Sequence, residues 1–246
     1  MSDVIFLKRG GARATINPLG GWLERLSIDG NDVLFPKSTL ENAAGERKVR
    51  GGCHICLPNF GPDATGNLSQ HGFARESQWD VFGEHTSGHI SLGLHVTEGE
   101  YSGLRALLNV RLTTSGMSLG LSIENQGQNV LSIAPAFHPY FVSHGKEGDI
   151  DGTSYSMDSL EEAQILNGAP RLVILDGQQF ALQATNLATW ILWSDRLAGY
   201  VCIEPTQSGF SFAEAPPSKA AVQLKPTQSW NCSMTIEKIQ TKEKIK

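Results

Sequence analysis

Three short segments carry polar side chains of types that can move protons or bind anions. His71 and Arg75 stand together in NLSQHGFARESQWDV, His138 lies within the aromatic run APAFHPYFV, and Glu204 follows apolar residues in GYVCIEPTQSGF. A neutral histidine can take up or release a proton near physiological pH, and a partly desolvated carboxylate at a strand end is a natural general base. Arginine keeps its charge and can bind a carboxylate or phosphate through two hydrogen bonds. These types together indicate acid–base chemistry on a small molecule that carries an anionic group.

A fourth segment, VRGGCHICLPNFGPD, places Arg50 before Gly51 and Gly52. A glycine pair lets the backbone approach a neighbour or a ligand closely. Each of the four segments also has an ordinary interpretation, namely a surface arginine before a turn, a core histidine bonded to backbone, or an exposed glutamate at a strand end. Taken singly, the arginine and the His-Gly pair favour that ordinary interpretation.

The cysteines offer a competing kind of chemistry. Cys53 and Cys56 form a C-x-x-C that encloses His54, and this spacing is compatible with metal binding or redox exchange. Cys202 and Cys232 are single residues in apolar, strand-like runs, and no thioredoxin-like pattern surrounds the motif. We therefore expect buried small side chains and neither a metal site nor a redox site.

The elements that position these residues read as strands. Among the 246 residues, 26 are glycine and 11 are proline, and short apolar or alternating runs lie between turn residues throughout the chain. Residues 105–124 predict a hairpin with its turn at Ser115 and Gly116, SLEEAQIL predicts a short helix or turn, and the TKEKIK end is expected to fray. We expect one domain over residues 1–246, a large antiparallel β-sandwich or barrel-like unit with its ligand site on a concave face or mouth.

Charge and hydropathy argue against several partners. The net charge of −5 gives no electrostatic footprint for nucleic acid or for an anionic membrane. No uninterrupted apolar stretch is long enough for a transmembrane helix, and the start of the chain lacks a signal-peptide pattern. We expect a cytoplasmic protein that binds neither nucleic acid nor membrane.

The four segments, taken in order, resemble one known family. Arg-Gly-Gly, His-Gly-Phe-Ala-Arg, Phe-His-Pro-Tyr-Phe and Cys-Ile-Glu-Pro are similar to motifs of the galactose mutarotase-like, or aldose 1-epimerase, family. RGGCHICLPNFGP and QHGFARESQWDV look most like its glucose-6-phosphate 1-epimerase (hexose-6-phosphate mutarotase) branch. The resemblance covers nearly the whole chain. It implies a large antiparallel β-sandwich and an isomerase that needs no cofactor or metal and interconverts the α and β anomers of a hexose or hexose 6-phosphate.

The resemblance also implies a role for each matching residue. Glu204 matches the base that takes the proton of the C1 hydroxyl, His138 the acid that protonates the ring oxygen, and His71 a second histidine that binds the sugar. Arg50 and Arg75 match two arginines that face the substrate phosphate. The family's hydroxyl-binding aspartate has no match, and no residue is assigned to that role.

A small-molecule aldose or aldose phosphate is thus the expected partner of a monomer or homodimer. The alternative is a non-catalytic carbohydrate-binding or sugar-sensing protein on the same fold. Such a protein would keep Arg50, Arg75 and the aromatic residues but would not need both His138 and Glu204. The presence of both favours the enzyme.

Overall fold

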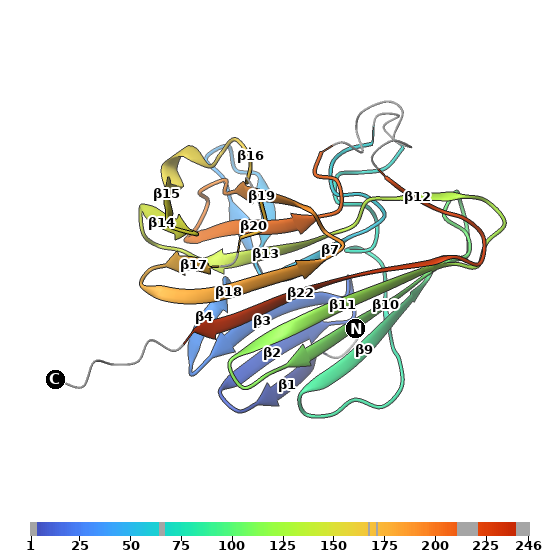
Figure 1. The fold of residues 1–246 in the computed structure, drawn as a ribbon, viewed down its shortest axis with the longest axis horizontal. Coiled ribbons are helices and arrows are strands. Elements are labelled where there is room, and N and C mark those ends of the chain that lie inside the picture. The colour runs from blue at the N-terminus through green and yellow to red at the C-terminus, as the bar shows by residue number, and fades with distance from the viewer. Residues whose placement is uncertain (1–3, 64–66, 167, 171, 211–220, 240–246) are drawn as a thin grey trace.

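Two large antiparallel sheets face each other in the computed structural model, which describes residues 4–63, 67–166, 168–170, 172–210 and 221–239 (Figure 1). The first sheet runs in the order β1 (Ile5–Arg9), β2 (Ala12–Asn17), β3 (Trp22–Ile28), β4 (Asn31–Leu34), β13 (Ala136–Val142), β20 (Tyr200–Thr206), β19 (Thr189–Trp193) and β16 (Gln164–Ile165), and β7 (Cys53–Cys56) pairs with both β3 and β13. The second sheet runs in the order β15 (Thr153–Ser156), β14 (Glu147–Ile150), β17 (Leu172–Leu175), β18 (Gln178–Thr185), β22 (Ser229–Ile239), β11 (Gly116–Asn125), β10 (Leu104–Leu112), β9 (His89–His95) and β8 (Asp80–Val81). The predicted antiparallel β-sandwich is confirmed.

Smaller elements complete the described part of the chain. β5 (Ser38–Glu41) pairs with β6 (Arg47–Arg50), and β12 (Leu131–Ile133) pairs with β21 (Val222–Leu224). SLEEAQIL contributes the last residue of the 3-10 helix η1 (Met157–Ser159), then bends and forms β16. Because η1 has three residues, no helix in the described ranges is long enough to cross a membrane. The TKEKIK end lies outside the described residues.

The predicted hairpin is present, since β10 and β11 pair from Leu104 opposite Asn125 to Leu112 opposite Met117. Alternate residues of the strands enter the space between the two sheets. Large side chains such as Trp79, Phe137 and Phe180 are fully buried there. Burial of this apolar surface is the main stabilising contribution to such a sandwich.

Strands β13 and β20 are buried on both faces. Phe137 and Phe141 of β13 point into the core between the sheets, whereas His138 and Tyr140 point to the opposite face. All four are at most 3% exposed. The second face is therefore covered as well, which explains why these strands read as continuous apolar runs with single polar interruptions.

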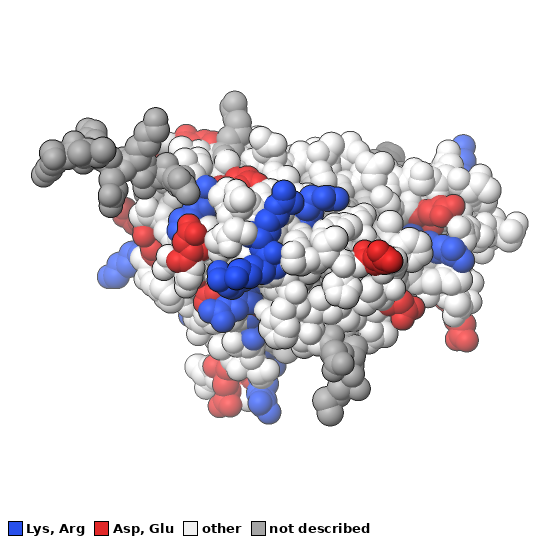
Figure 2. Space-filling model, turned by 90° about the horizontal axis from the view of Figure 1, so that it is seen from below, with Lys and Arg blue, Asp and Glu red and all other residues white. Residues whose placement is uncertain are grey.

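Charged side chains of both signs share the face drawn in Figure 2. Lysines and arginines gather across its middle, and acidic side chains lie mainly toward its ends. The chain as a whole has a net charge of −5. Groups of cations thus exist on a molecule of net negative charge, so local geometry rather than global charge decides where an anion can bind.

Candidate active site

A row of polar side chains crosses three adjacent strands on the outer face of the first sheet. His54 of β7 is opposite His138 of β13. The register between β13 and β20 puts Tyr140 opposite Cys202, which places His138 opposite Glu204. Side chains at the same register on neighbouring strands point to the same face. The fold therefore brings two imidazoles and a carboxyl group side by side from segments far apart in the sequence.

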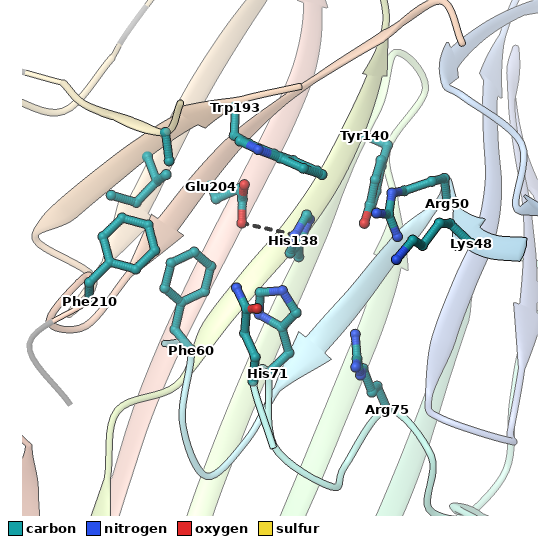
Figure 3. A pocket seen from close by; sticks show the side chains of 13 residues that line it. Lys48, Arg50, Phe60, His71, Arg75, His138, Tyr140, Trp193, Glu204 and Phe210 are labelled. Carbon is teal, nitrogen blue, oxygen red and sulfur yellow. Dashed lines mark ion pairs between the residues drawn. The ribbon is translucent and has the colours of Figure 1, made fainter. Parts of the chain in front are cut away.

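His138 and Glu204 are in direct contact. Their Nε2 and Oε2 atoms are 3.2 Å apart, and the two side chains are 3% and 2% exposed (Figure 3). Glu204 Oε2 and His138 Nδ1 have no aligned hydrogen-bond partner among the described residues. Both residues line the same pocket, so a ligand there would lie beside the pair.

Burial controls the protonation of this pair. It raises the pKa of Glu204 well above its usual value. Burial, followed by the neighbouring His54 and His71, lowers the pKa of His138 well below its usual value. These opposite shifts favour the neutral form of the pair, in which the proton is on the carboxyl group.

His71 reaches the pocket from a tightly held loop. Its ring packs edge-on against His138, with ring centroids 4.9 Å apart. Its φ of +70° and that of Gly72, +66°, turn the chain sharply, and a Cβ on Gly72 would lie 2.2 Å from the carbonyl oxygen of Leu57. Glycine is therefore required after His71. Burial, followed by the charge of Arg75, lowers the pKa of His71 to about 3.

Three cationic side chains, Lys48, Arg50 and Arg75, occupy one side of the pocket (Figure 3). Arg50 Nε donates a hydrogen bond to Asp195 Oδ2 at 2.8 Å, and Arg50 Nη2 is 2.8 Å from the same oxygen. Arg75 Nε has no hydrogen-bond partner among the described residues, and it is 3.7 Å from the exposed Glu76 carboxylate. The charge of Arg50 is thus largely balanced, whereas the carboxylate that faces Arg75 Nε is more distant.

Aromatic rings enclose the rest of the pocket, whose volume is about 300 Å³. Tyr140 stacks on His138 with ring centroids 4.7 Å apart, and Trp193 meets His138 edge-on at 6.3 Å. Phe60 and Phe210 lie on the side away from the three cations (Figure 3). The site therefore has an aromatic side, a central acid–base pair and a cationic side, which suits a small polar molecule with an anionic group at one end.

All five residues that the sequence motifs predicted as site residues line this one pocket: Arg50, His71, Arg75, His138 and Glu204. The predicted strand-end position of Glu204 is wrong, because β20 continues through Pro205 to Thr206. The carboxyl group is therefore buried within the sheet rather than half-exposed at its edge.

Several lining residues were not predicted from the sequence: Lys48, Phe60, Gln70, Trp193 and Phe210. One signal for Lys48 was present, since it stands two residues before Arg50 and alternate residues of a strand share a face. Trp193 lies in β19, where its direction depends on strand register, whereas Phe60, Gln70 and Phe210 lie in bends and turns between strands.

The C-x-x-C motif lies in β7, where Cys53 packs in the core between the sheets and Cys56 packs with residues of the opposite face. A separation of three residues in a strand directs side chains to opposite faces. All four cysteines are buried free thiols. The expectation of buried small side chains is confirmed.

A family model described as aldose 1-epimerase matches residues 3–198. The chain belongs to the aldose 1-epimerase family. Among curated relatives, a protein of Escherichia coli K12 named "Putative glucose-6-phosphate 1-epimerase" is 29% identical over 138 residues, which is 53% of this chain and 44% of the relative. A protein of the same name from Cenchrus ciliaris is 38% identical over 68 residues, 28% of this chain and 20% of the relative. These alignments thus span less than half the length of the curated relatives.

The fold of this aldose 1-epimerase family member also matches solved structures. A galactose mutarotase-like protein from Lactobacillus casei superposes with a TM-score of 0.78 at 16% identity, over 96% of this chain and all of that one. At 16% sequence identity, this match supports the β-sandwich fold alone.

Proposed function

We propose that the protein is an aldose 1-epimerase that interconverts the α and β anomers of a hexose 6-phosphate. The observation that carries the proposal is the buried contact between His138 and Glu204 at the centre of a small pocket. Anomer exchange needs one group to remove a proton from the C1 hydroxyl and another to add a proton to the ring oxygen. A carboxyl group and an imidazole that share one proton are suited to both tasks.

Ring opening starts with Glu204 as a carboxylate and His138 as an imidazolium. Glu204 takes the proton of the C1 hydroxyl, His138 gives its proton to the ring oxygen, and the bond between C1 and the ring oxygen breaks to leave an aldehyde. Rotation about C1–C2 and the reverse transfers close the ring with the other configuration. Nothing is oxidised or reduced, and each positioned group contributes on the order of 10²–10⁴-fold to the rate.

Burial acts differently on the two forms of the pair. Ring opening converts the charged form of the pair into the neutral form, and the total number of protons on the pair is unchanged. Burial of Glu204 and His138 favours that neutral form. The charged form that starts ring opening is therefore the less favoured form in the free protein, and the neutral form is the one that accompanies the open-chain sugar.

The cationic side of the pocket supports a phosphorylated substrate. Arg75 lines the pocket and its Nε has no hydrogen-bond partner among the described residues, and Lys48 and Arg50 add positive charge beside it. Charge-assisted hydrogen bonds from arginine suit phosphate oxygens. The names of the curated relatives point the same way. His71, adjacent to His138, would bind the sugar between the phosphate and the reacting carbon.

Exchange spectroscopy by NMR tests the proposal directly. Glucose, galactose and their 6-phosphates are compared with and without the protein, and the exchange between α and β signals is measured. We expect faster exchange with a preference for a 6-phosphate. Binding of the sugars without faster exchange would instead establish the non-catalytic carbohydrate-binding alternative.

A further inference from the structure

Cys202 is a buried thiol beside the reacting pair that the anomer exchange does not use. It lies two residues before Glu204 on β20 and opposite Tyr140 of β13, so its side chain shares the face of the pair. It packs with Tyr140 and Tyr200 and is fully buried. A sulfur ligand is therefore held next to a nitrogen and an oxygen ligand.

The distances suit one metal ion. One ligand atom each of His138, Cys202 and Glu204 lies within 4.8 Å of the other two, and His138 Nε2 is 3.2 Å from Glu204 Oε2. Nitrogen and oxygen ligands of tetrahedral zinc, at ~2.0–2.2 Å from the metal, are about 3.3 Å apart. The observed separation therefore matches, and the sulfur needs only a modest approach.

Two further observations support binding at these atoms. Glu204 Oε2 is buried and has no aligned hydrogen-bond partner in the described part of the chain, so a metal would satisfy it rather than break a bond. His138 and Glu204 line the pocket, through which an ion can reach the pair.

We propose that His138, Cys202 and Glu204 bind a thiophilic divalent cation of the zinc class, which reversibly inhibits the enzyme. On binding, the Cys202 thiol loses its proton and the His138–Glu204 pair loses its shared proton, and both protons pass to solvent. One thiolate, one carboxylate and a neutral imidazole then balance the charge of the ion, as a buried site requires. Sulfur and nitrogen ligands select zinc, cobalt or cadmium over magnesium.

The ion would occupy the two groups that transfer protons to and from the sugar. Inhibition therefore rests on the proposed function, but metal binding does not. The two can be separated by measuring binding with a spectroscopic probe and inhibition by anomer exchange.

The binding experiment titrates chelator-treated protein with Co²⁺. We expect a thiolate-to-cobalt charge-transfer band that Zn²⁺ abolishes by displacement. Cys202→Ser and Cys202→Ala should both lose the band and weaken Zn²⁺ binding at least about 100-fold, because loss of a ligand exceeds the 10–100-fold cost typical of outer-shell changes. Cys56→Ser and Cys232→Ser are matched controls that also remove a buried thiol, and they should keep the band.

The activity experiment compares anomer exchange with added Zn²⁺ or Mg²⁺. Zn²⁺ should inhibit the wild-type protein, Mg²⁺ should not, and the Cys202 variants should exchange anomers normally and resist Zn²⁺. Absence of the charge-transfer band, or equal Zn²⁺ affinity in wild-type and Cys202 variants, would overturn the metal site. A normal band in a protein that exchanges no sugar would overturn the proposed function instead.

Discussion

Arg50 is paired with Asp195, since Asp195 Oδ2 accepts a hydrogen bond from Arg50 Nε at 2.8 Å and lies 2.8 Å from Arg50 Nη2. Arg75, on the same side of the pocket, has no such partner for its Nε in the described ranges. The two arginines that the sequence motifs treat alike are therefore electrostatically different. Arg75 is the stronger candidate for direct contact with a phosphate, and Arg50 forms part of the pocket wall while it is held by Asp195.

Replacing Arg75 should separate phosphorylated from free sugars. A hydrogen bond to a charged group contributes about 1.5–3 kcal/mol, so Arg75→Ala should raise KM for the sugar phosphate by roughly 10–100-fold. KM for the free sugar should change little. Steady-state anomer exchange with both substrates measures this. Arg25→Ala, which removes an arginine paired with Asp32 outside the pocket, is the control. Equal effects of Arg75→Ala on both sugars would count against a phosphate contact.

Glu204→Gln should abolish anomer exchange without loss of the fold. Glutamine cannot take a proton from the C1 hydroxyl, so the rate should fall by at least about 10²-fold. Because burial raises the pKa of Glu204 and so favours its neutral form, the neutral glutamine should be tolerated within about 1 kcal/mol of unfolding free energy. NMR exchange and denaturant unfolding provide the measurements. Glu98→Gln, at an exposed position, is the matched control. An unchanged rate of anomer exchange in Glu204→Gln would show that Glu204 does not take part in the mechanism.

The rate should be flat across neutral pH and fall on both sides. The active form of the pair holds one proton. It loses that proton as pH rises through the raised pKa associated with Glu204, and it gains a second as pH falls through the lowered pKa associated with His138. The dependence of kcat on pH reports both limits for the bound enzyme. A single transition near pH 6.5, as for an unperturbed histidine, would contradict a shared proton.

The sequence contained enough to predict the sandwich and the five motif residues. Turn residues between short apolar runs define the strands, and polar residues interrupting such runs are conspicuous at His138 and Glu204. What could not be predicted depends on register. Trp193 becomes a pocket wall because β19 pairs with β20 such that Trp193 is opposite Cys202. Similarly, Cys202 and His138 are 64 residues apart in the chain, and they converge only because β13 and β20 pair.

The burial of Glu204 was the second property that could not be predicted from the sequence. Pro205 suggested that the strand ended at Glu204, yet proline at this position is accommodated in β20. The difference matters because a half-exposed carboxyl group would keep an ordinary pKa, whereas burial raises the pKa of Glu204 well above its usual value. The residues that meet in the pocket were therefore predictable, but the form that burial favours for their proton required the packed structure.

His71 should make the stability of the protein depend on pH. Its folded-state pKa is about 3, whereas an unfolded histidine titrates at about 6.5. Between these values the unfolded chain binds a proton that the folded chain does not, so His71 stabilises the fold above about pH 6.5 and this contribution is lost as pH falls. His71→Asn should lower the slope of unfolding free energy against pH by about 1.4 kcal/mol per pH unit in that window.

The His71→Asn variant is suitable because asparagine tolerates the positive φ at this position. Urea unfolding over a pH series measures the difference in slope, and His95→Asn, at an exposed position, is the control. Identical slopes for wild-type and His71→Asn would mean that His71 is protonated in the folded protein.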